Sequence, residues 1–262
     1  MGLPISITAP RKFPVVTITI ILINVVVFAL MYIDPSALVP GANNAYEVQI
    51  ALAATPAAII RGENLWTLIT AMFIHANIYH LLGNMLFLFV FGGPVESAMG
   101  SKRFLVFYIL SGLAADLFHI LSISLIPKEY LLTKAVLNPW VTPTLGASGA
   151  ISGVMGAYFI YYPRTRVTFI YPIFIIPLIL YLPAWVYVTI WFIYQLIMGL
   201  VSLLGVVTSV AYWAHIGGFI TGVALAPYFL DPKIKMWIKI RRMLWSHVYR
   251  DISDHYYEEE FF

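Results

Sequence analysis

The sequence contains no cysteine and few charged residues. The lack of cysteine excludes disulfide bonds, iron–sulfur clusters and thiolate metal sites. Only 10% of the 262 residues are charged, whereas a soluble domain usually has about 25%. The hydrophobic fraction is 61% and the mean hydropathy is +0.88. These values predict a polytopic membrane protein. The net charge of +3 is small and spread along the chain, which argues against nucleic acid as a partner.

Six apolar segments are long enough, or nearly so, to cross a membrane as helices, which takes about 20 residues. They are Val15–Ile33, Tyr79–Ala98, Phe104–Ile126, Ala147–Tyr162, Ala184–Leu204 and Val210–Leu230. We therefore predict an all-α membrane domain of six transmembrane helices over residues 15–230. It follows an N-terminal segment, 1–14, and precedes a basic and acidic tail, 231–262. No small-residue cleavage site follows the first apolar run, so we expect that helix to be retained rather than removed as a signal peptide.

A further apolar segment, Val167–Pro183, is ambiguous. Pro172, Pro177 and Pro183 recur in it every five or six residues, and proline removes a backbone donor and breaks helices. We therefore interpret this segment as re-entrant or interfacial rather than as a spanning helix.

The distribution of basic residues sets the orientation of the bundle. With six spans and both termini cytoplasmic, twelve of the fifteen lysines and arginines lie on the cytoplasmic side, as the positive-inside rule requires. A seventh span would move the six basic residues that follow residue 230 to the outside. We expect this C-terminal basic cluster to bind the membrane surface. A prokaryotic plasma membrane is the simplest location for so compact a chain.

Four polar residues fall at the outer ends of three predicted spans. His80 and Asn84, in "HLLGN", are one helical turn apart on the second span and share a face. Ser148, in "GASG", begins the fourth span, and His215, in "AHIGG", lies near the start of the sixth. The topology alone therefore places all four at one depth. Polar and ionisable residues in spans are costly and commonly functional, so these four are candidate site residues.

These residue types suit acyl transfer. Serine is a weak nucleophile until a base removes its proton, and His215 is a candidate base for Ser148. The oxyanion that develops needs hydrogen-bond donors, which Asn84, His80 and the backbone N–H of Ser148 can supply. Ser148 lies in the first turn of its helix, where N–H groups have no intrahelical partner.

Glycines accompany the serine and the histidine. Gly149 and Gly153 form one small-xxx-small pair, and Gly218 and Gly222 form another. Such pairs let membrane helices approach closely, which would bring the serine hydroxyl within about 3 Å of the histidine. Taken singly, each motif is also typical of helix packing or of a structural histidine. Both interpretations stay open from these residues alone.

The three motifs in this order, on the second, fourth and sixth spans, resemble the rhomboid family of intramembrane serine proteases. The resemblance covers about Leu65–Leu230, with a compatible first span. It implies a dyad of Ser148 as nucleophile and His215 as general base and acid, with His80, Asn84 and the Ser148 N–H as the oxyanion hole. It also implies that the substrates are single-pass or polytopic membrane proteins, which enter laterally from the lipid bilayer past the fifth span. No cofactor and no metal are implied.

The chain departs from some rhomboid relatives in two places. Several have a tyrosine one turn after the nucleophile that stacks on the catalytic histidine, where this chain has Ser152. What orients His215 is therefore an open question. Several also have Trp-Arg before the second span, where this chain has Trp66 and Thr67.

Other polar residues have less specific interpretations. His75 precedes His80 by five, which is off-face on a helix, and the resemblance to the rhomboid family implies that it supports the loop structure. No HExxH motif is present, so a zinc protease is disfavoured. Asp116 and His119 are expected to hydrogen-bond each other or a neighbouring helix, and two ligands are too few for a typical zinc site. Glu96 is expected to pair with basic residues or to cap backbone groups.

Two classes of non-enzymatic function are alternatives to the protease hypothesis. A transporter would call for charges at the midplane and often an internal repeat, and neither is evident. A catalytically silent relative that binds membrane proteins is the alternative function. Such relatives generally lose the serine or the histidine, and this chain keeps both Ser148 and His215.

Overall fold

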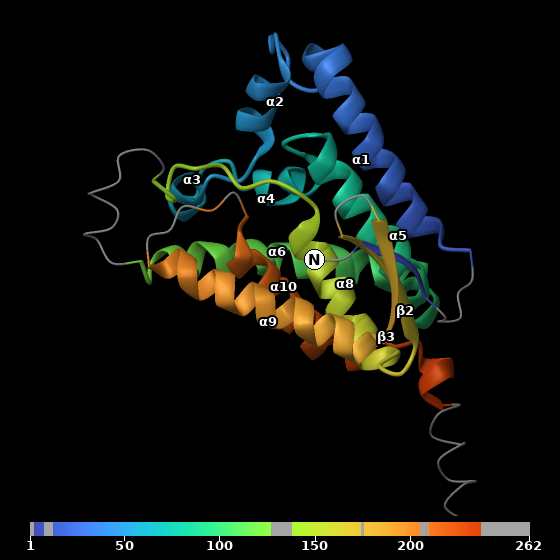
Figure 1. Cartoon of the computed structure of the whole chain (residues 1–262). Coiled ribbons are helices and arrows are strands. Elements are labelled where there is room, and N and C mark those ends of the chain that lie inside the picture. The colour runs from blue at the N-terminus through green and yellow to red at the C-terminus, as the bar shows by residue number, and fades with distance from the viewer. Residues whose placement is uncertain are drawn as a thin grey trace, which may run out of the picture.

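The computed structural model describes residues 3–7, 13–126, 138–173, 176–204, 208 and 210–236, and the described chain is mostly helical (Figure 1). All six segments predicted as spans are helices, and no bound differs from the prediction by more than three residues. The helices are α1 Val15–Ile33, α5 Ile78–Met99, α6 Ser101–Ile123, α8 Ser148–Tyr161, α9 Ala184–Leu203 and α10 Tyr212–Phe229.

Four of these helices, α1, α5, α6 and α9, are long and apolar enough to cross a membrane. Helices α8 and α10 are shorter, with 14 and 18 residues. The boundary of the predicted tail at residue 231 stays a prediction, and most of that tail lies outside the described residues.

The prediction of an all-α fold is wrong for one part of the chain. Val167–Pro183 belongs to an antiparallel hairpin of β2 Arg166–Ile173 and β3 Ile176–Pro183. Its residues are mainly Val, Thr, Ile, Tyr and Phe, which favour strands, and prolines prevent a helix. Pro172 pairs with Pro177 near the turn. The backbone N–H groups that these two prolines lack are therefore both missing at one end of the strand pairing.

The hairpin returns to the level at which it begins, because Arg166 pairs with Pro183. The N–H of Ala184, the first residue of α9, also donates to the carbonyl of Thr165 at 2.7 Å. This path agrees with a re-entrant or interfacial segment and not with a span.

The N-terminal strand β1, Leu3–Ile7, completes a three-stranded sheet in the order β1-β2-β3. It pairs antiparallel with β2, which joins the start of the chain to the folded unit. Val167 and Phe169 of β2 alternate toward the helices and are buried there. The Phe169 ring lies 5.3 Å from the ring of Tyr187 on α9.

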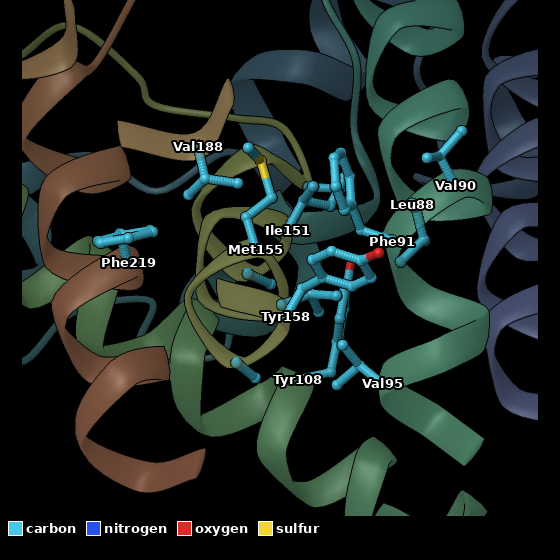
Figure 2. Packing of buried hydrophobic residues seen from close by; sticks show 14 of the residues in the cluster. Leu88, Val90, Phe91, Val95, Tyr108, Ile151, Met155, Tyr158, Val188 and Phe219 are labelled. Atoms are coloured by element: carbon cyan, nitrogen blue, oxygen red, sulfur yellow. The ribbon is translucent and has the colours of Figure 1, made fainter. Parts of the chain in front are cut away.

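Helix α8 lies at the centre of the bundle and contacts α5, α6, α9 and α10 (Figure 1). Every residue from Gly149 to Tyr158 is buried. Figure 2 shows the apolar core on the α5 side of α8, where the Tyr158 ring meets Phe91 edge-on at 5.0 Å. Burial of so many apolar side chains stabilises the packing and fixes the position of the helix that begins with Ser148.

The long connection between α1 and α5 contains short helical turns rather than a spanning helix. They are η1 Pro35–Ala37, α2 Ala45–Leu52, α3 Pro56–Ile60, α4 Thr67–Thr70 and η2 Ala71–Phe73. A small apolar cluster that includes Met31, Val48 and Ile74 packs this connection against the end of α1.

Glu96, near the end of α5, caps the start of α1. Its carboxylate accepts hydrogen bonds from the backbone N–H groups of Val16 and Thr17, at 3.0 and 2.8 Å, and from two hydroxyls, those of Thr17 and Ser101. The first N–H groups of a helix lack intrahelical partners, and the helix dipole favours a negative charge there. The capping interpretation of Glu96 is therefore confirmed.

We expect Glu96→Ala to lower the free energy of unfolding by at least about 3 kcal/mol, because each buried donor left unpaired costs about 1–3 kcal/mol. Thermal unfolding in detergent measures the change. Glu63→Ala is the matched control, since its exposed carboxylate pairs with Arg61 and such exposed pairs contribute little to stability. Equal melting temperatures for the two variants would contradict the capping role.

Candidate active site

Helices α8 and α10 pack closely because glycines face each other along the contact. A Cβ added to Gly218 would lie 2.1 Å from the carbonyl oxygen of Gly149, and one added to Gly222 would lie 2.0 Å from that of Gly153. Any larger residue would therefore force the backbones apart. This is the close approach that the two small-xxx-small pairs predict.

The close contact brings Ser148 and His215 together. The Ser148 Oγ lies 2.7 Å from the Nε2 of His215, within hydrogen-bond distance. The two residues come from different helices and are 67 positions apart in the sequence. A serine and a histidine at this distance have the geometry of a nucleophile and its general base.

Two residues of α9 hold the other side of the His215 ring. The Oε1 of Gln195 lies 2.8 Å from the His215 Nδ1, and the ring of Trp191 stacks on the imidazole with centroids 6.2 Å apart. Gln195 and Trp191 are buried and one helical turn apart, so both face α10. Neither was predicted from the sequence as a site residue.

His80 and Asn84 lie beside the segment that leads into α8. Gly146 has a φ of +118°, and a Cβ there would lie 2.7 Å from two atoms of the His80 ring and 3.6 Å from the Asn84 Nδ2. Glycine is required on both counts, because side chains rarely adopt this φ and the space is occupied. The structure therefore brings both predicted oxyanion donors against a residue two positions before Ser148.

His75 supports the side chain of Asn84. Its Nε2 lies 2.9 Å from the Asn84 Nδ2, and its ring meets that of His80 edge-on at 5.0 Å. An amide nitrogen can only donate, so the His75 Nε2 accepts one of its two hydrogens. The second hydrogen of the Asn84 Nδ2 is left for another acceptor. This agrees with a supporting role for His75.

The segment before Ser148 is tied to the α1–α5 connection by backbone hydrogen bonds. Ala54 and Thr144 exchange two of them, at 2.9 and 2.8 Å, and the N–H of Gly146 donates to the carbonyl of Ala71. The approach to α8 is therefore fixed at two points, Thr144 and Gly146.

One side-chain atom each of Asp116 and His119 lacks the predicted hydrogen bond. Within the described residues, the Asp116 Oδ2 and the His119 Nδ1 are buried without a partner. Phe118, which lies between them in the sequence, packs on α10, where its Cβ fills the space beside Gly217. The described part of the chain also contains no group of three His, Asp or Glu residues that could hold a metal ion.

A family model described as the Rhomboid domain matches residues 62–232, which include all four candidate residues. The chain belongs to the rhomboid family. With its apolar helices, this makes it an integral, multi-pass membrane protein.

Individual rhomboid relatives are similar over part of their length. The chain is 30% identical to RHOMBOID-like protein 6, mitochondrial, of Arabidopsis thaliana, over 70% of this chain and 50% of the relative. It is 31% identical to the rhomboid protease AarA of Providencia stuartii, over 60% and 56%. It is 30% identical to the rhomboid protease GluP of Bacillus subtilis, over 55% and 24%. The chain thus spans about half or less of these relatives, two of which are named as proteases.

No tyrosine one turn after Ser148 holds His215 in this rhomboid protein. Ser152 occupies that position, and its hydroxyl donates to the carbonyl of Ser148 at 2.7 Å instead of reaching His215. The ring that stacks on His215 is Trp191, from α9. The open question about the orientation of His215 therefore has a structural answer on another helix.

The supporting histidine gives a pH-dependent stability. Burial, with a smaller contribution from His80, lowers the pKa of His75 from 6.5 to about 3. Between these values the unfolded chain binds one proton more than the folded chain, so stability falls as the pH falls, at about 1.4 kcal/mol per pH unit. We expect His75→Gln to reduce the slope of the unfolding free energy against pH, between pH 6 and 4, by the amount that corresponds to about one bound proton. An unchanged slope would contradict a buried, neutral His75.

Proposed function

We propose that this rhomboid protein is an intramembrane serine endopeptidase that cleaves membrane-protein substrates. The observation that carries the proposal is the 2.7 Å contact between the Ser148 Oγ and the His215 Nε2. The membership in a family that includes named proteases supports it.

In the proposed reaction, the Ser148 oxygen attacks the carbonyl carbon of the scissile peptide bond while its proton passes to the His215 Nε2. The tetrahedral oxyanion accepts hydrogen bonds from the Asn84 amide, the His80 ring and the Ser148 backbone N–H. The intermediate then collapses, and His215 gives the proton to the departing amine. Water, deprotonated by His215, hydrolyses the acyl-enzyme and restores the serine.

We infer that this reaction takes place below the outer surface of the membrane. Helix α8 has 14 residues, a length of about 21 Å, whereas the hydrocarbon core is about 30 Å thick. With six spanning helices and cytoplasmic termini, Ser148 begins α8 on the outer side. Substrates that reach it are therefore segments within or next to a transmembrane helix, and they enter laterally from the bilayer. A prokaryotic plasma membrane is the proposed location, with a mitochondrial membrane as the alternative that relatives named as mitochondrial suggest.

The test is cleavage of a single-pass membrane protein in proteoliposomes, with mass spectrometry of the products. We expect two fragments that end in or near the transmembrane segment, and none from an equimolar soluble peptide with the same sequence. Co-purification of the intact substrate without fragments, in bilayers of several compositions, would instead favour the alternative function, a catalytically silent rhomboid-like binding protein.

Asn84→Ala should lower the cleavage rate by about 10²–10³-fold, which is the usual cost of one lost oxyanion donor. The effect should fall on kcat rather than on KM, because the donor acts on the transition state. Asn44→Ala is the matched control, since this asparagine caps α2 in the connection between α1 and α5. An unchanged kcat in Asn84→Ala would assign the residue a structural role only.

A further inference from the structure

Helix α9 presents one continuous face to α10. Trp191, Gln195 and Gly199 follow each other at intervals of four, so they lie along one side of α9. The Gly199 carbonyl accepts a hydrogen bond from the Trp213 Nε1 at 3.0 Å, and a Cβ at Gly199 would lie 3.0 Å from the Cδ1 of Ile216. This close contact, one turn beyond Gln195, fixes the distance between α9 and α10 at the level of His215.

We propose that Gln195 is the positioning residue of the His215 base, with Trp191 as the ring that holds the imidazole plane. This inference rests on the proposed function, because it assigns the third member of the same Ser148–His215 site. Gln195 touches neither the reacting atoms nor the serine; it acts through His215.

The hydrogen-bond chemistry of Gln195 sets the tautomer. Its Oε1 can only accept a hydrogen bond, so the His215 Nδ1, at 2.8 Å, carries the ring proton. The neutral imidazole then has its lone pair on Nε2, which points to the Ser148 hydroxyl at 2.7 Å. The opposite tautomer would place a proton on Nε2 and could not accept the proton of the serine. Gln195 therefore selects the form of His215 that can act as a base.

An amide suits this buried place better than a carboxylate. Gln195 is 4% exposed and lies on an apolar helix, where an unpaired negative charge is costly to desolvate. The neutral amide oxygen accepts the same hydrogen bond without that cost. Stacking on Trp191 restricts the remaining motion of the ring, since the interplanar angle is 29°.

The test compares Gln195→Met, which keeps the length but removes the acceptor, with Gln195→Glu, which keeps the acceptor. Ser202→Ala is the control, because among the described residues its hydroxyl bonds to the Gly199 carbonyl alone, on the same helix. The readouts are the ¹⁵N NMR signals of the His215 ring in detergent, identified by their loss in His215→Ala, and the rate of covalent labelling by a fluorophosphonate.

We expect the Nδ1–H tautomer in the wild type and in Ser202→Ala, and also in Gln195→Glu at a pH where the new carboxylate is ionised and can only accept. In Gln195→Met we expect the Nε2–H tautomer to appear and the labelling rate to fall by about 10²–10⁴-fold, as when a histidine base loses its orienting partner. An unchanged tautomer in Gln195→Met would overturn the proposal whatever the activity. If the wild type does not react with the probe but the tautomer still changes, the proposed function fails and the positioning role stands.

Discussion

Ser148→Ala should remove all measurable proteolysis while the protein still folds and inserts into the membrane. In serine proteases the loss of the nucleophile costs about 10⁶-fold in kcat, and the loss of the histidine base costs about as much. The cause is chemical, because alanine has no oxygen to form the acyl-enzyme. The measurement is cleavage of a transmembrane substrate in proteoliposomes, with the melting temperature in detergent as the check on folding.

Ser152→Ala is the matched control for this variant. Ser152 lies one turn further along α8, is buried, and donates its hydroxyl only to the Ser148 carbonyl. We expect it to keep most of the activity, since the carbonyl of Ser148 still accepts its helical hydrogen bond. Normal cleavage by Ser148→Ala would show that another group is the nucleophile.

Gly222→Ala should be the most damaging substitution that leaves every candidate site residue in place. The new Cβ would lie 2.0 Å from the carbonyl oxygen of Gly153. A backbone oxygen cannot rotate away as a side chain can, so α8 and α10 must separate. Ser148 and His215 lie on these two helices, and a displacement of about 1 Å in a catalytic pair can cost about 10²-fold in rate. We expect a fall in kcat of at least that size, together with a lower melting temperature.

Gly83→Ala is the control for Gly222→Ala. Gly83 is also a helical glycine, but nothing lies within 4 Å of its added Cβ. Because alanine favours helices over glycine by about 1 kcal/mol, this variant should be as stable as the wild type or slightly more so. If Gly222→Ala behaved like Gly83→Ala, the close glycine contact would not be what sets the distance between Ser148 and His215.

The positions of the helices follow from the sequence because a long apolar run has few stable forms in a membrane. The bounds of α1 agree with the predicted span at both ends, and those of α5 within one residue. The strands escaped prediction because β3 is apolar on both faces and both strands carry prolines, so most of the segment lacks the alternating pattern of a half-exposed strand. The pairing partner β1 is also 159 residues away in the sequence, from Ile7 to Arg166, and no local signal marks such a contact.

The candidate site was predictable only in part. The order of the spans placed His80, Asn84, Ser148 and His215 at one depth, and the paired glycines indicated which helices touch. The sequence does not specify the rotation of each helix about its axis, so it did not indicate that Gln195 and Trp191 face His215. A polar side chain in an apolar span was the available signal for Gln195. The role of Gly146 depends on a positive φ and on the position of the His80 ring, which only the folded chain defines.

The most direct test of the central claim is labelling by a fluorophosphonate in detergent micelles, followed by mass spectrometry of the modified peptide. The reagent forms a covalent bond only with a serine that a base has activated, so it reports the Ser148–His215 pair without a known substrate. We predict a stoichiometric adduct on Ser148 in the wild type and none in Ser148→Ala or His215→Ala. An adduct on another residue, or no adduct on a folded wild-type protein under conditions that label a known rhomboid protease, would contradict the claim.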